Sequence, residues 1–264
     1  MAQFLRDAHL ANIKITEDAI SQLTEVFANR AKILFDAATS QGNEDKKPLL
    51  TFIIRFDGKG YRLFSLDDLI MHFRRAKSIE RIIITIETLE SLRSNRLIGE
   101  HLEVRFDKFD ENNCYLSATS DDSDWVDSSY SAVQELLEKY KTKNGWARSG
   151  WTTLMIQLLG IIVGFALSLW AAARISPHLA IENAFIITFF FALLIFSNTW
   201  GYISALILSR VHLLFPNVQF YRPDKDRLNW LMQALIGGIA TAFMLYVFSL
   251  LFGFIGDFLS KLPK

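Results

Sequence analysis

The C-terminal half of the chain contains three long apolar stretches, residues 151–173, 184–208 and 228–256. A helix needs about 20 apolar residues to cross about 30 Å of hydrocarbon, and each stretch reaches that length without a charged residue inside it. Buried helices of a large soluble protein share this pattern, but three in series with few polar residues between them favour a membrane. The pattern therefore predicts a membrane domain of residues 146–264 with three transmembrane helices.

Residues 1–145 show the shorter periodicities of a soluble domain. Two segments have apolar residues at helical spacing. Other segments have the alternating or continuous apolar residues, often β-branched, that are typical of strands. The predicted helices are residues 16–38, a helix capped by Ser65 and residues 125–140, and the predicted strands are residues 49–56, 61–64, 79–89, 102–109 and 114–119. The order α-β-β-α-β-β-β-α predicts an α+β domain with helices packed on a mostly antiparallel sheet.

Turn and cap residues support these boundaries. Thr16 and Ser65 can each cap the helix that follows, and the sequence Asp57-Gly58-Lys59-Gly60 has the residues of a tight turn between two strands. The isoleucine-rich run of residues 79–89 is typical of a central strand that is covered on both faces.

Charge is distributed unevenly along the chain. Residues 1–150 hold 21 of the 28 Lys and Arg and 24 of the 28 Asp and Glu, which leaves little charge for the apolar half. A slightly acidic soluble domain gives no excess of positive charge to bind a phosphate backbone, so we do not expect nucleic acid as a partner. The single Cys114 and the absence of an apolar signal-peptide core predict a reducing compartment, the cytosol.

Basic residues near the apolar stretches predict the orientation, because Lys and Arg are retained on the cytoplasmic side. Eight lie before the first stretch or between the second and third, and three lie on the opposite side. We therefore predict a multi-pass protein of the cell (inner) membrane with a cytoplasmic N-terminus and a C-terminus outside.

Each apolar stretch carries a stripe of small residues, which lets helices in lipid approach closely. The positions are Gly160 and Gly164 in the first stretch, Ser197, Gly201 and Ala205 in the second, and Ala234 and Gly238 in the third. The stripes either pack the three helices against one another or join copies of the chain into a homo-oligomer.

Few polar side chains lie at depth in the apolar stretches. Asn198 can hydrogen-bond to Gln157 or Gln233, or line a polar seam if several copies assemble. No Asp, Glu, Arg or His lies there, which argues against a coupled transporter.

The loop of residues 215–223 alternates apolar and polar side chains and contains two prolines. This composition is unsuited to a helix. Two interpretations remain open: an extended segment at the membrane interface, or a segment that docks on the cytosolic domain.

No motif predicts an enzyme, a cofactor or a metal site. Asp57-Gly58-Lys59-Gly60 lacks the spacing of a nucleotide-binding loop, and the acidic residues 121–127 lack the spaced ligands of a calcium loop. The histidines are scattered, and Cys114 is a small core residue of a strand rather than a nucleophile.

Two functional hypotheses follow. In the first, the cytosolic domain binds a protein or a small ligand and is coupled to a three-helix membrane anchor in a regulatory or scaffolding role. In the second, the helices assemble in the lipid bilayer into a pore or a membrane-disrupting effector that the cytosolic domain gates.

Overall fold

The computed structural model describes residues 3–222 and, beyond them, single positions between 234 and 253. The chain divides into two compact units. One unit runs from the N-terminus to Gly145 and includes a second segment that begins at Pro216, and the other contains the chain between Trp146 and Phe215. The domain division expected from the sequence therefore changes at one point, because residues 216–222 belong to the α+β unit.

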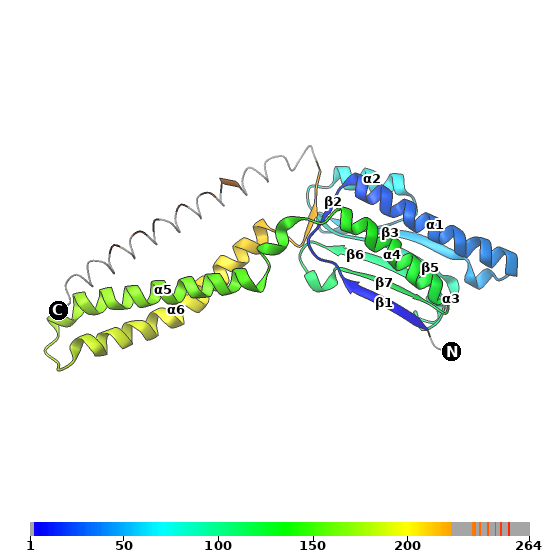
Figure 1. Ribbon diagram of the computed structural model, residues 1–264. Helices are drawn as coiled ribbons and strands as arrows, with labels where there is room; N and C mark the ends of the chain where they lie inside the picture. Colours follow the sequence, from blue (N-terminus) through cyan, green and yellow to red (C-terminus); the bar gives the residue numbers. More distant parts are fainter. Residues whose placement is uncertain are drawn as a thin grey trace. The chain divides into compact units, whose positions relative to one another are not determined.

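The α+β unit is built on a six-stranded sheet in which every pairing is antiparallel, as predicted. The strands follow the order β1-β7-β6-β5-β3-β4 (Figure 1). Their bounds are β1 Phe4–His9, β3 Pro48–Phe56, β4 Lys59–Leu63, β5 Ile79–Thr88, β6 His101–Asp107 and β7 Tyr115–Ser120. Strand β1 was not expected from the sequence. It is an edge strand whose side chains are almost all exposed, so it has no alternating pattern.

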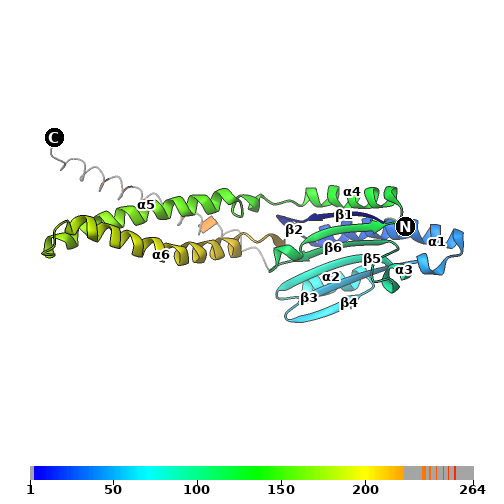
Figure 2. The same cartoon turned by 90° about the horizontal axis from the view of Figure 1, so that it is seen from below.

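Three helices cover one face of this sheet: α1 (Glu17–Gln41), α2 (Leu66–Arg75) and α4 (Ser123–Lys139) (Figures 1 and 2). The predicted caps are confirmed, since the side chains of Thr16 and Ser65 accept hydrogen bonds from backbone amides in the first turns of α1 and α2. The core lies between helices and sheet, with Phe27, Phe52 and Phe106 buried within it.

Strand β5 takes the central position predicted for it, between β3 and β6, but among the described residues helices cover only one of its faces and not both. Its helix-facing side is fully buried through Ile82, Ile84 and Ile86. The other side, which carries Ile83 and Thr85, looks away from the helices but remains nearly buried. We call this second side of the sheet the open face (Figure 2). The short helix α3 (Leu89–Arg93) connects β5 to the loop before β6.

A second, two-stranded sheet completes the domain. Strand β2 (Ile13–Ile15) pairs in parallel with β8 (Val218–Phe220), about 200 residues further along the chain. Ile13, Ile15, Val218 and Phe220 all belong to the core cluster. Of the two interpretations of the loop at residues 215–223, the structure supports docking, because residues 216–222 pack on the α+β unit. We call residues 216–222 the strap.

The helical unit contains α5 (Gly150–Ile175), the short turn η4 (Ser176–His178) and α6 (Ala184–Leu214). Both long helices have the length and composition to cross a membrane. In the described chain, no residue of α6 is buried and α5 buries only Gly160, Ser168 and Ala172. The structure therefore shows two of the three predicted spans as candidates. The third, residues 228–256, lies outside the described residues except for single positions.

We predict that a fragment of residues 3–145 is much less stable than the same fragment joined to the strap by a short Gly-Ser linker. Burial of Val218 and Phe220 against β2 contributes about 1.5–3 kcal/mol for each side chain, so loss of the strap removes about 3–6 kcal/mol. Urea unfolding of the two fragments measures this difference. The double variant Val218→Asp with Phe220→Asp in the joined fragment should be as unstable as the fragment that lacks the strap. Equal urea midpoints for the fragments with and without the strap would contradict the prediction.

Candidate functional site

The second residue of the strap is Asn217, whose side chain is buried and makes two hydrogen bonds with the connection between β1 and β2. Its Oδ1 accepts from the amide of Asn12 at 2.8 Å, and its Nδ2 donates to the carbonyl of Leu10 at 3.1 Å. The main chain is held as well, because the amide of Ile13 donates to the Asn217 carbonyl at 2.9 Å. A buried asparagine with these partners fixes the start of the strap.

The strap ends with Arg222, which is also buried. Its guanidinium donates to the carbonyls of Ala76 and Lys77, the latter at 3.0 Å, where α2 ends. Helix C-termini carry partial negative charge on unpaired carbonyls, so a guanidinium is well suited to this position.

The connection that Arg222 contacts is tied in turn to the β3–β4 turn. The carboxylate of Asp57 accepts hydrogen bonds from the amides of Lys77 and Ser78 at 3.0 and 2.9 Å. These two backbone hydrogen bonds lower the pKa of Asp57, and the positive charges of Lys77 and Arg222 lower it further. Asp57 and Gly58 both have positive φ, as the predicted tight turn requires.

Between its two ends the strap is held by β2 and by the chain that leaves the domain. The backbone amide of Tyr221 donates to the carbonyl of Ile15 at 2.8 Å, and the Lys14 ammonium lies 3.6 Å from the centre of the Tyr221 ring. Asn144 donates to the carbonyl of Pro216 at 3.4 Å. The points where the chain leaves and re-enters the domain are therefore neighbours.

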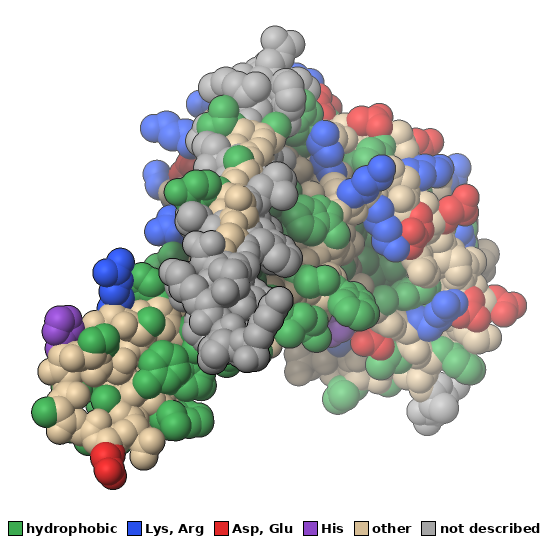
Figure 3. Space-filling model, turned by 60° about the vertical axis from the view of Figure 1, so that its left-hand side comes forward, with side chains coloured by type: hydrophobic (Ala, Val, Ile, Leu, Met, Phe, Trp, Pro, Cys, Tyr) green, Lys and Arg blue, Asp and Glu red, His purple; other side chains and the backbone are tan. Residues whose placement is uncertain are grey.

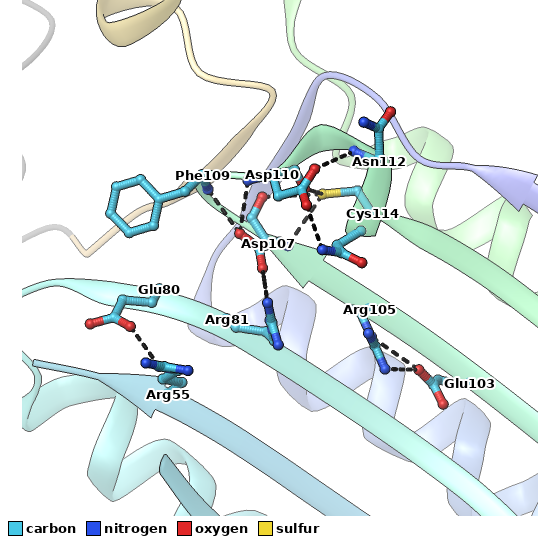
Figure 4. Close-up of polar contacts among 11 residues, drawn as sticks. Arg55, Glu80, Arg81, Glu103, Arg105, Asp107, Phe109, Asp110, Asn112 and Cys114 are labelled. Atoms are coloured by element: carbon cyan, nitrogen blue, oxygen red, sulfur yellow. Dashed lines mark hydrogen bonds and ion pairs between the residues drawn. The ribbon is translucent and has the colours of Figure 1, made fainter. Parts of the chain in front are cut away.

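Ion pairs join neighbouring strands on the open face, next to the turns that the strap contacts (Figure 4). Arg81 binds Asp107 at 2.6 Å, and Arg55 binds Glu80 at 2.9 Å. Burial would raise the pKa of Asp107, but the amides of Asp110 and Phe109, together with Arg81, lower it. The turn after β6 is therefore organised around one ionised carboxylate.

Cys114 connects that turn to the strap. Its thiol donates to the Asp107 carbonyl at 3.1 Å, and its own carbonyl accepts from the amide of Leu10, the residue whose carbonyl Asn217 binds. Burial raises the pKa of the thiol, which fits the predicted role as a core residue.

Further along β6, Glu103 is the most deeply buried carboxylate of the open face. It accepts a hydrogen bond from Arg105 at 3.1 Å (Figure 4). It also accepts a hydrogen bond from Tyr115 at 2.8 Å, and Arg96 lies 3.1 Å away. Burial would raise its pKa, but hydrogen bonds from His101 and Tyr115 and the charges of Arg105 and Arg96 lower it to about 2. Arg96 therefore holds the loop before β6 against the sheet.

The open face as a whole is a polar surface of paired charges. Arg55 with Glu80 and Arg81 with Asp107 form cross-strand pairs, and Arg105 pairs with Glu103 on the same strand, β6. Within the part of the chain that the structure describes, no cluster of three His, Cys, Asp or Glu could hold a metal ion. A polar, rigid and nearly charge-balanced sheet surface is suited to contact a protein or a small polar ligand.

The structure brings three of the small residues predicted from the sequence to one place. Gly160 and Gly164 of α5 and Ser197 of α6 line a cavity of about 290 Å³ together with Trp200. A Cβ atom at Gly160 would lie 1.9 Å from the Trp200 ring, so only glycine fits there. At Gly164 a Cβ would be 3.7 Å from Phe196, an ordinary contact.

The remaining predicted positions do not join this contact. Asn198, Gly201 and Ala205 are exposed on α6, and Ala234 and Gly238 are among the singly described residues, also exposed. Among the described residues no hydrogen bond connects Asn198 to Gln157, and Gln233 lies outside them. The partner predicted for Asn198 within the two described helices is therefore not found.

Sequence reasoning missed the anchoring roles of Asn217 and Arg222 and the carboxylate network at Glu103. The strap depends on partners up to 207 residues distant, and Glu103 combines its neighbour Arg105 with Tyr115 on the adjacent strand. The two prolines of the loop pointed only to an extended segment.

Comparison with family models, with curated proteins and with solved structures finds nothing that matches the chain. The function must therefore be argued from the geometry.

We predict that Glu103→Gln lowers stability most at neutral pH. Because folding lowers the pKa of Glu103 from 4.5 to about 2, its contribution is present above pH 5 and is lost as the pH falls towards 2. The contribution is about 3 kcal/mol at pH 7. Urea unfolding of the strap-joined domain between pH 7 and pH 3 tests this, with the exposed Glu135→Gln as the matched control. A pH-independent difference between Glu103→Gln and the native sequence would refute the assignment.

Proposed function

We propose that the chain is an integral membrane protein whose α+β domain binds a cytosolic protein or small ligand on its open face and is coupled through the strap to the membrane helices. The single observation that carries the proposal is the return of the chain into the domain directly after α6. A simple anchor needs one connection to its domain. Here the segment after the second apolar helix provides β8, Asn217 and Arg222 to the domain.

The strap offers a physical route for coupling. Asn217 is linked through Leu10 and Cys114 to the turn of Asp107, and Arg222 is linked through Lys77 to the turn of Asp57. Both turns border the open face. A change at the end of α6 that pulls on the strap would shift these turns, and a ligand that fixes the turns would stabilise the strap.

The topology is part of the proposal. The excess of basic residues before α5 and after α6 supports a cytoplasmic domain in a cell (inner) membrane. With residues 228–256 as the third span, the C-terminus lies outside. The exposed small residues of α6 support assembly into a homo-oligomer.

We predict that Gly160→Ala changes the domain through the strap. The new methyl group collides with Trp200, so α5 and α6 must shift relative to each other. In the full-length protein in lipid nanodiscs, hydrogen exchange of amides in residues 76–80 and 107–113 should accelerate at least about threefold, a change of about 0.7 kcal/mol in local opening.

Two comparisons make this experiment specific. Gly164→Ala is the matched control, because its methyl group makes only an ordinary contact and should leave the turns unchanged. In the background Asn217→Ala with Arg222→Ala, Gly160→Ala should have no further effect on the turns. Equal exchange in the two glycine variants would reject coupling through the strap.

A second function, an oligomeric pore or membrane-disrupting effector gated by the domain, is supported by one observation. The small residues of α5 face α6, but Gly201 and Ala205 of α6 are exposed among the described residues, and none of those residues places an atom within 4 Å of a Cβ built at Gly201. This smooth face is available to the third span or to another copy of the chain.

We predict for this second function that Gly201→Leu reduces ion flux through liposomes and lowers the oligomeric mass in detergent, because the larger side chain blocks close approach of a neighbouring copy. Tyr202→Leu, at a position that is 75% exposed on α6, serves as the control. Flux that is unchanged by Gly201→Leu would exclude a pore built on this face.

A further inference from the structure

One end of the α+β domain carries exposed lysines from three connections. Lys59 begins β4, Lys77 follows α2 and Lys108 follows β6. The chain after β6 lies next to the chain after α2. The backbone amide of Lys108 donates to the Glu80 carbonyl at 2.9 Å, and the Lys108 ammonium lies 3.4 Å from the Ser78 hydroxyl. Within the described residues, none of these three lysines forms an ion pair, in contrast to Lys47 and Lys141.

The nearby carboxylates are largely engaged by other partners. Asp57 accepts from two backbone amides, Asp110 accepts from the amide of Asn112 and the side chain of Asn113, and Glu138 pairs with Lys141. Glu111 is exposed in the same turn as Asp110 and has contacts of its own. The lysines therefore remain the groups most available to an incoming anion.

A large hydrophobic side chain is exposed beside Lys108. Phe109 is 71% exposed, and the ammonium of Lys108 lies 5.6 Å from its ring centre. In Figure 3, basic and hydrophobic side chains share the visible side of the domain. Aromatic and basic side chains together suit the headgroup region of a bilayer, where the ring is partly buried and the ammonium groups meet phosphates.

The chain leaves and re-enters the domain at the same end. The side chain of Asn144 donates to the carbonyl of Pro216, and Ile13 forms an isolated antiparallel β-bridge with Lys141. Lys143 is exposed in the segment that leads to α5. Helix α5 begins only five residues after Gly145. If α5 enters a bilayer, as the proposed function states, few residues separate this end from the headgroups.

We propose that the surface formed by Lys59, Lys77, Lys108, Phe109 and Lys143, here called the turn-end surface, binds the headgroups of anionic lipids. This inference rests on the proposed membrane location and adds a lipid class to it. Because the same surface includes the turns to which Arg222 and Asn217 are linked, lipid charge would act on the elements that border the open face.

The test uses the full-length protein in nanodiscs of phosphatidylcholine alone and of phosphatidylcholine with phosphatidylglycerol. Hydrogen exchange of residues 57–60 and 107–113 should slow about fivefold or more in the anionic discs, and the protection should fade as salt is raised. Lys77→Gln with Lys108→Gln should remove most of the protection, and Phe109→Ser should reduce it.

Leu97→Ser is the matched control, because Leu97 is 76% exposed in the loop that precedes β6, whereas Phe109 follows the same strand. It should leave the lipid-dependent protection intact. Equal exchange in both kinds of disc, or protection that the lysine variants do not change, would overturn the inference. Protection that appears in neutral discs only after an acidic protein is added would assign the surface to a protein partner and also overturn it.

Failure of the wider proposal looks different. A chain that does not incorporate into nanodiscs of either composition would reject the membrane location itself. A chain that incorporates but shows no dependence on lipid charge would reject only the lipid-binding surface.

Discussion

The parallel pairing of β2 with β8 is the interaction on which the rest of the α+β domain depends. Two strands of three residues each cannot stand alone in water, so they are stable only because their four apolar side chains enter the core. The pairing also joins positions about 200 residues apart, with α5 and α6 between them. The core of the α+β domain is therefore complete only after both apolar helices have been synthesised. Folding of the domain and placement of the helices are thus coupled.

The open face illustrates a different constraint, because its carboxylates are buried without a covering layer. Glu103 and Asp107 remain ionised since arginines and hydrogen-bond donors surround them, and removal of one partner would leave an uncompensated charge. For the ligand binding that we propose on this face, side chains already held in pairs favour specific recognition, because little side-chain entropy is lost on binding.

Local sequence signals predicted the parts of the fold that local physics determines. Helices α1, α2 and α4 appeared at their positions because apolar spacing and caps such as Thr16 and Ser65 act within a few residues. Strands β1 and β2 did not, since an exposed edge strand has no alternating pattern and a strand of three residues is too short to show one. For β8 the alternation in residues 215–223 indicated an extended segment but not its partner β2. For the helical unit, the sequence identified Gly160 as a packing residue but not its partner Trp200, because stripes of small residues do not specify which side chain will fill them.

The two sets of polar contacts in the domain differ in how they respond to acid. Arg222 donates hydrogen bonds to main-chain carbonyls, and Asn217 both donates to and accepts from main-chain groups. None of these groups changes its charge in the pH range in which proteins are folded. The open face instead depends on carboxylates with lowered pKa values, Glu103 foremost, and loses its contribution as the pH falls. Acid should thus loosen the open face while β8 stays paired. The contacts that hold the strap on the domain therefore persist where the ion pairs of the open face are lost, as the proposed coupling through the strap requires.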